Sequence, residues 1–202
     1  GDGKKEMPVV GLLILWTTDR AEKTLDGQGL ILDGQGKLST RRGKSSLHVE
    51  ALGANAGMER AQKVAFALGE FYRMPTGLKY QQAEIECGRM PVPIDLIVDA
   101  KCLYDLLASR AVPKTSDEGS LLYVKWLKER YESGAIDGLV WCSTQDQLSD
   151  PLTKTSVDSW LLVRVMMEKK VELLWSALRN GKLVNPEKGL PPPKSAKDEA
   201  AY

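Results

Sequence analysis

The chain has 202 residues, of which 43% are hydrophobic and 27% are charged, and its formal net charge is +1. This length allows one domain with extensions or at most two small domains, and the hydrophobic share is enough for a packed core. A net charge so close to zero excludes a globally basic protein, so any nucleic acid must be bound through a local patch.

Cysteine and histidine are too scarce for a soft-ligand metal site. The three cysteines, Cys87, Cys102 and Cys142, show no C-x-x-C spacing, and His48 is the single histidine. A zinc site built on thiolates or imidazoles is therefore nearly excluded. The odd cysteine count favours a reducing compartment. No apolar run reaches the length of a membrane span and no signal-peptide pattern occurs, so we expect an intracellular protein, cytoplasmic or nuclear, that is not secreted.

Strand patterns come first along the chain. The apolar, β-branched run Val9–Trp16 predicts a buried strand. Asp-Gly steps at Asp26 and Asp33 flank Leu30–Leu32 and predict hairpin turns around a second strand. The pattern then becomes helical from Ser46 to about residue 72, with Ser45 or Ser46 as its N-cap.

The rest of the chain alternates between helical and extended patterns. We expect helices at 77–87, 101–109, 117–131 and 157–181, and strands at 94–98 and 139–142. The last helix is predicted from an apolar stripe formed by Trp160, Val163, Met167, Val171, Leu174 and Leu178. From Pro186 onward the composition is typical of a disordered tail. The fold class that follows is mixed α/β.

Glu50 is the first of three candidate functional acids. The apolar stripe of the helix that begins at Ser46 includes Ala54 and Met58, and one step of four residues back leads to Glu50. A carboxylate on a core-facing stripe is costly unless it is paired or binds a metal. The alternative is a solvated acid in the first helical turn, where negative charge is favoured.

Asp99 and Asp150 each follow a short apolar strand. The carboxyl end of such a strand opens into the crevice where α/β sheets bind ligands. The alternative for both residues is helix capping, with Ala100 or Pro151 as the first helical residue. A third possibility starts the later helix near Thr144 and places Pro151 in its second turn.

Four segments of this sequence resemble the RNase H domain of copia-type LTR retrotransposon polyproteins. They are Ser45–Leu52, Ile97–Asp105, Lys128–Ile136 and Trp141–Lys154, and the last segment is the most specific. They occur in the family's order within residues 9 to 154. The resemblance implies an RNase H-like mixed sheet with flanking helices at 1–155 and does not cover the chain from Val157 onward. For that part, the apolar stripe and the composition predict a C-terminal helix at 156–183 and a disordered tail at 184–202.

The resemblance also implies a function and a site. Such enzymes hold two divalent ions, Mg²⁺ or Mn²⁺, about 3.5–4 Å apart and hydrolyse the RNA strand of RNA–DNA hybrids. Matching the motifs assigns Glu50, Asp99 and Asp150 as catalytic metal ligands. The hybrid backbone is expected to contact a basic cluster made of Lys37, Arg41, Arg42 and Lys44, for which a solvated strand edge is the alternative. The implied partner protein is the remainder of a reverse transcriptase polyprotein, and no membrane is expected.

The sequence departs from the family at its N-terminal end. Asp2 matches a loop, which places the family's first catalytic Asp and its central strand before residue 1. The loss of one ligand weakens a two-metal site. We therefore also consider a catalytically inactive RNase H-like remnant that binds nucleic acid or is only structural. A third reading is an unrelated α/β domain whose acids are helix caps.

Overall fold

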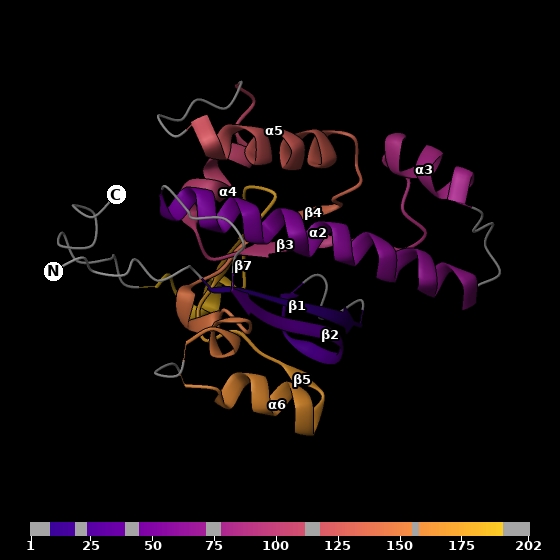
Figure 1. Cartoon of the computed structure of the whole chain (residues 1–202). Helices are drawn as coiled ribbons and strands as arrows, with labels where there is room; N and C mark the ends of the chain where they lie inside the picture. Colours follow the sequence, from indigo (N-terminus) through magenta and orange to yellow (C-terminus); the bar gives the residue numbers. More distant parts are fainter. Residues whose placement is uncertain are drawn as a thin grey trace, which may run out of the picture.

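The computed structural model describes residues 9–18, 24–38, 45–71, 78–111, 118–154 and 158–191. These residues form two β-sheets with helices packed around them (Figure 1). The predicted mixed α/β class is therefore confirmed. None of the helices formed by these residues is long and apolar enough to cross a membrane.

The first sheet contains a long antiparallel hairpin. Strand β1 (Val9–Thr17) pairs with β2 (Gly27–Leu38), and the short β5 (Lys170–Val171) pairs with the start of β2. Its strand order is β1-β2-β5. The turn predicted at Asp33 is wrong, because Asp33 lies inside β2 and pairs with Ile14 of β1. The register of the two strands shifts by one residue at a β-bulge next to this pair.

The second sheet contains the two short strands that the sequence predicts. Strand β3 (Asp95–Val98) runs parallel to β4 (Gly138–Trp141), so their carboxyl ends lie side by side. Two further strands, β6 (Ala177–Arg179) and β7 (Lys182–Val184), extend this sheet in antiparallel fashion. The order β3-β4-β6-β7 makes it a mixed sheet.

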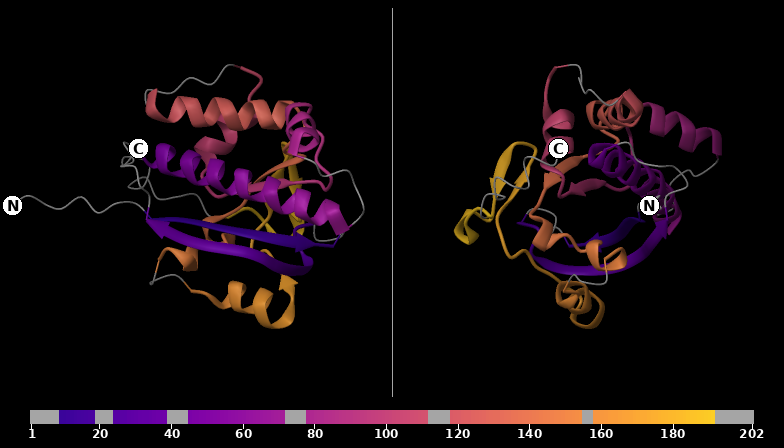
Figure 2. Two further views of the ribbon diagram at one scale, coloured as in Figure 1. Left: turned by 45° about the vertical axis from the view of Figure 1, so that its right-hand side comes forward. Right: turned by 60° about the vertical axis from the view of Figure 1, so that its left-hand side comes forward.

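Helices cover both sheets. Their bounds are α2 (Ser46–Phe71), α3 (Leu78–Glu86), α4 (Lys101–Ala108), α5 (Glu118–Glu132) and α6 (Trp160–Glu168). Helix α2 lies between α5 and the β1–β2 hairpin, while α6 lies on the far side of that hairpin (Figures 1 and 2). The Ser45 hydroxyl caps α2 by accepting a 3.1 Å hydrogen bond from the His48 amide, as predicted.

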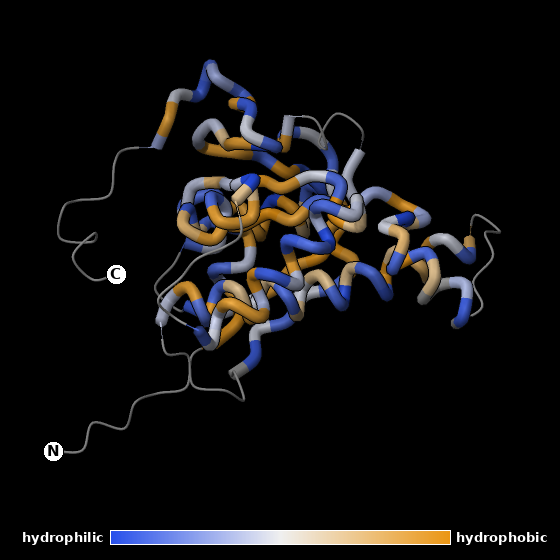
Figure 3. Tube along the Cα trace, turned by 90° about the horizontal axis from the view of Figure 1, so that it is seen from above, coloured by the Kyte–Doolittle hydropathy of each residue, from blue (hydrophilic) through white to orange (hydrophobic). Residues whose placement is uncertain are grey.

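The main core lies where α2, α4, α5 and β3 meet. Met58 of α2, Leu103 and Leu107 of α4, Leu127 of α5 and Val98 of β3 are buried there. Apolar segments concentrate in the middle of the molecule in Figure 3. Burial of large aliphatic side chains contributes roughly 1.5–3 kcal/mol each, so this cluster supplies much of the stabilisation.

The predicted helix at 157–181 is wrong. Helix α6 ends at Glu168, because Lys169 adopts the left-handed conformation with φ of 57° and terminates it. The chain then forms β5, β6 and β7, and Leu173 and Ala177 are buried in a second core cluster with Val140 and Cys142. The predicted tail also begins too early, since residues 184–191 are described as ordered structure that includes a 3₁₀ turn at Pro186–Lys188. Residues 192–202 lie outside the described part.

Candidate acidic site at the ends of strands β3 and β4

The parallel pairing of β3 and β4 sets the geometry of the candidate site. Asp99 follows β3 directly, and Cys142 follows β4 directly. The Cys142 amide donates to the Val98 carbonyl over 3.1 Å, and the Trp141 indole Nε1 donates to the Asp99 carbonyl over 2.9 Å. These two hydrogen bonds hold the residues after both strands at the same edge of the sheet.

Three carboxylates lie within electrostatic range of the Cys142 thiol. Burial raises the pKa of Cys142 well above its ordinary value, and the negative charges of Asp99, Asp146 and Asp150 raise that pKa further. Asp99 and Asp150, two of the three acids predicted from the sequence, therefore both lie within electrostatic range of this one thiol.

Asp99 does not cap the following helix. Helix α4 begins at Lys101, its N-cap residue is Ala100, and no side chain caps it. The Asp99 side chain is half-buried beside the strand ends. The capping alternative is therefore wrong for this residue, and Asp99 has no role in starting the helix.

Asp150 is buried and carries a counter-ion from its own segment. It is the first residue of a short 3₁₀ turn at Asp150–Leu152, with Ser149 in the cap position, so it is not the cap either. Its carboxylate is 2.7 Å from the Lys154 ammonium, and Asp150 is 9% exposed. The pair neutralises a carboxylate that would otherwise be costly to bury.

Glu50 points elsewhere. Its side chain is exposed, whereas its helical neighbours His48 and Ala51 are buried. The expected core-facing stripe through Glu50 is therefore wrong, because the buried stripe of α2 passes through Ala51, Met58, Gln62 and Ala65. A difference of one residue rotates a side chain by about 100° around a helix axis.

The three predicted ligands do not form one group. Within the described ranges, no three or more His, Cys, Asp or Glu side chains lie close enough together to hold a metal ion. The carboxylates as placed here therefore do not fit a two-ion site built on Glu50, Asp99 and Asp150.

Asp146 is a fourth acid that sequence reasoning missed. Its buried carboxylate accepts hydrogen bonds from the backbone amides of Leu174 and Trp175 at 2.5 and 3.1 Å. Burial raises the pKa of Asp146 above its ordinary value of 3.8, while these two amides act in the opposite direction. No local pattern signals this role, because the partner amides lie about thirty residues further along the chain.

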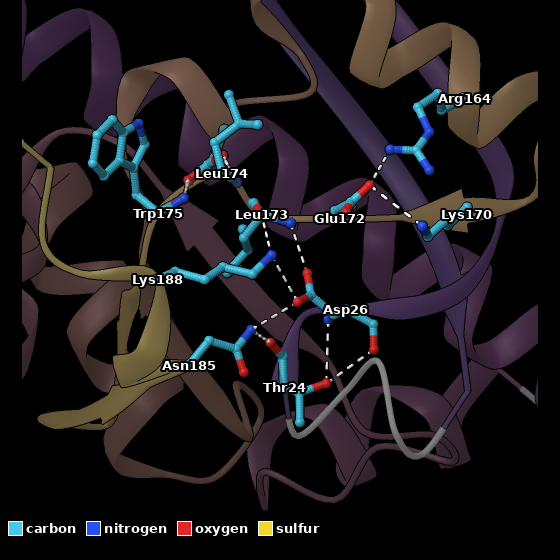
Figure 4. A network of polar contacts seen from close by, with 11 residues as sticks. Thr24, Asp26, Arg164, Lys170, Glu172, Leu173, Leu174, Trp175, Asn185 and Lys188 are labelled. Atoms are coloured by element: carbon cyan, nitrogen blue, oxygen red, sulfur yellow. Dashed lines mark hydrogen bonds and ion pairs between the residues drawn. The ribbon is translucent and has the colours of Figure 1, made fainter.

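Asp26 anchors the same C-terminal segment (Figure 4). Its carboxylate accepts a 2.7 Å hydrogen bond from the Leu173 amide and lies 2.9 Å from the Lys188 ammonium. Asn185 donates a 3.1 Å hydrogen bond to the same carboxylate. Asp26 and Asp146 together bind three consecutive amides, so they fix the path of residues 173–175 beside the end of β4.

The predicted basic cluster is described only at Lys37. This residue lies on β2 and its side chain is exposed. Arg41, Arg42 and Lys44 lie outside the described residues. Comparison with known proteins finds no family model, no curated protein and no solved structure that matches the chain.

Proposed function

We propose that this chain is the RNase H domain of a copia-type retrotransposon polyprotein and that it hydrolyses the RNA strand of RNA–DNA hybrids. The observation that supports the proposal best is that Asp99, directly after β3, and Asp150 both lie within electrostatic range of Cys142, which directly follows the parallel strand β4. These two acids come from the two segments whose sequences carry most of the resemblance. Strand ends of this kind are the usual place for ligand binding in α/β sheets.

In this proposal Asp99 and Asp150 are the residues that approach the scissile phosphate, and Mg²⁺ or Mn²⁺ is the required cofactor. Oxygen ligands are what these hard cations prefer. Bound ions of this type activate water and stabilise the leaving oxygen in phosphoryl hydrolysis. Because the described acids do not form a metal-sized group, we assign no step to a bound ion. The proposed role of Glu50 as a third ligand requires a different position for its side chain.

The proposal also includes partners. The substrate is an RNA–DNA hybrid whose backbone is contacted by Lys37 and by Arg41, Arg42 and Lys44. The domain belongs to a polyprotein that contains a reverse transcriptase. The proposal also specifies the fold within the mixed α/β class, namely an RNase H-like sheet.

Cleavage of a hybrid duplex tests the catalytic proposal. The substrate is a duplex with end-labelled RNA, incubated with the full chain and Mg²⁺. We expect products from the RNA strand alone, and at least a hundredfold loss of rate in Asp99→Asn. Asp105→Asn is the matched control, because Asp105 lies on the same segment but is exposed and paired with Lys101 on α4. Equal losses in both variants would contradict a catalytic role for Asp99.

A second candidate function is hybrid binding without cleavage. The observation that favours it is the Asp150–Lys154 ion pair, because a carboxylate that already has an internal counter-ion gains less from binding an external cation. Fluorescence anisotropy with a labelled hybrid in EDTA measures binding alone. Retained binding together with no Mg²⁺-dependent cleavage supports the remnant function and contradicts the nuclease.

A further inference from the structure

Helix α6 is apolar on its two opposite sides. Leu161, Leu162 and Val165 form the buried side. The helix contacts β2 and β5, on the side of the β1–β2 hairpin away from α2 (Figures 1 and 2). A helix that is apolar all round is normally covered all round, as in the core of a large protein.

The other side of α6 is an apolar stripe that is open to solvent. Its four residues, Trp160, Val163, Met166 and Met167, are between 38% and 78% exposed. Because a helix turns by about 100° per residue, these four side chains occupy an arc of about 120° around the helix axis. The other five residues of α6 lie outside that arc, so the stripe is uninterrupted. An exposed apolar face of this kind marks a contact surface.

The charged side chains beside the stripe pair with one another. The Arg164 guanidinium forms ion pairs with Glu168 at 3.2 Å and with Glu172, and the Lys170 ammonium lies 3.5 Å from the Glu172 carboxylate. These two cations and two carboxylates leave the group without net charge. Membrane surfaces and nucleic acids are bound by clustered cations. The balanced charge therefore favours a protein partner for this face.

Each end of α6 carries one further charge, and the two are of opposite sign. Asp158 precedes the helix, and its carboxylate accepts a 3.0 Å hydrogen bond from the Trp160 amide. Lys169 follows the helix, and its ammonium donates a 2.8 Å hydrogen bond to the Met166 carbonyl. Both residues are exposed, and neither has an ion-pair partner within the described ranges. The stripe therefore lies between a negative and a positive charge that are both available.

We propose that α6 is a self-association surface, on which a second copy of this chain packs its own α6 antiparallel to the first. A two-fold axis near the middle of the helix opposes Trp160 to Met167 of the second copy, and Asp158 to Lys169 of the second copy. Both ends of the stripe then gain an ion pair, and these pairs fix the register. A parallel arrangement opposes like charges instead. The proposal does not depend on nuclease activity.

The small size of the stripe makes the association weak. A helix of nine residues is about 14 Å long, so its exposed side is smaller than the roughly 800 Å² that each partner buries in a stable complex. We therefore expect a dissociation constant on the order of 0.1 mM.

Sedimentation equilibrium of the full chain tests the self-association. Between about 10 µM and 1 mM, we expect the average mass to rise from that of a monomer toward that of a dimer. Met167→Ser is expected to weaken association at least tenfold. Leu190→Ser, which alters an exposed leucine outside α6, is the matched control and is expected to associate like wild type. A monomer at every concentration overturns the proposal. Flotation with phosphatidylserine vesicles also overturns it if Met167→Ser abolishes that binding, because a membrane is then the occupant.

Exchange of the two end charges tests the antiparallel arrangement. Asp158→Lys and Lys169→Asp each oppose like charges in a dimer, so we expect each variant alone to associate at least tenfold more weakly. An equal mixture of the two variants restores both ion pairs and is expected to dimerise at least as well as wild type. Lys182→Asp on β7 is the control and is expected to associate normally, and circular dichroism checks that every variant is folded. A mixture that remains monomeric, or single variants that associate like wild type, overturns the proposal.

Discussion

Cys142 has an environment that suppresses the reactivity of its thiol. It is 1% exposed, and burial and three neighbouring carboxylates all raise its pKa. Thiol reactions proceed through the thiolate, so a thiol that is both buried and resistant to ionisation is inert. Cys87 and Cys102, by contrast, are exposed free thiols.

This difference leads to a prediction about thiol counting. In the folded chain at pH 8, we expect two thiols to react with a chromogenic disulfide reagent within minutes. The third, Cys142, is expected to react at least a hundredfold more slowly, and to react readily in denaturant. The Cys142→Ala variant is expected to lose the slow phase alone. A fast third thiol in the native chain would show that the strand ends are open to solvent.

A second residue-scale prediction concerns Asp146 and pH. Because burial raises its pKa above 3.8, the folded state binds this proton at a higher pH than the unfolded state does. The contribution of Asp146 to the free energy of unfolding is therefore greatest at low pH, and it falls as pH rises through the raised pKa. Asp146→Asn removes the titration. We expect wild type to gain stability relative to this variant as pH decreases toward 4, measured by urea unfolding. A difference in unfolding free energy between wild type and Asp146→Asn that does not change with pH would contradict the raised pKa of Asp146.

The four acids show how far sequence reasoning reaches at this scale. The position of Asp99 directly after β3 was predictable, because an apolar run followed by an acid is a local pattern. Asp150 lies further from its strand, in a 3₁₀ turn well beyond the end of β4. The direction of the Glu50 side chain was not predictable, because an apolar stripe with several alanines fits more than one rotation of the helix about its axis. Asp146 was not predictable either, because its partners are backbone amides of a distant segment.

Among the elements, the C-terminal segment differs most from expectation. Its apolar residues recur at helical spacing up to Leu178, but the helix ends at Glu168, the left-handed Lys169 follows it, and short strands come next. Asp26 and Asp146 bind the amides of residues 173–175, and β6 pairs with β4. Tertiary hydrogen bonds of this kind override a periodic pattern. The segment consequently completes the second core cluster of the same domain.

Two adjacent leucines provide a test of this arrangement. Leu173 is 7% exposed and belongs to the second core cluster, whereas Leu174 is 38% exposed. We expect Leu173→Ala to lower the free energy of unfolding by about 2–3 kcal/mol, and Leu174→Ala to change it by less than about 1 kcal/mol. Chemical denaturation followed by tryptophan fluorescence measures both variants. A continuous helix over 157–181 would bury Leu174 instead, so a larger loss of stability in Leu174→Ala than in Leu173→Ala would contradict the observed fold of this segment.

At the scale of the whole molecule, the α/β class and most element positions were predictable from hydrophobic period and turn residues. The division into two sheets was not. It depends on which strands pair, and strands of similar apolar sequence such as β1 and β3 carry no local signal of their neighbours. Helix α2 links the two sheets by contacting both end strands.

The balance of charge over the whole molecule leads to the last prediction, which depends on the proposed hybrid binding. A net charge of +1 means that attraction to a duplex comes from a few local cations, so the logarithm of affinity should fall with the logarithm of salt concentration by a small slope. Each phosphate contact contributes about 0.9 to that slope for a DNA duplex. We expect Lys37→Gln to reduce the slope by about 1 and to weaken binding equally for hybrids of different sequence. Lys182→Gln, which alters an exposed lysine on β7, is the control and is expected to leave the slope unchanged. Equal changes of the salt slope in the two variants would mean that only the total charge of the protein affects binding. Lys37 would then not belong to the proposed interface.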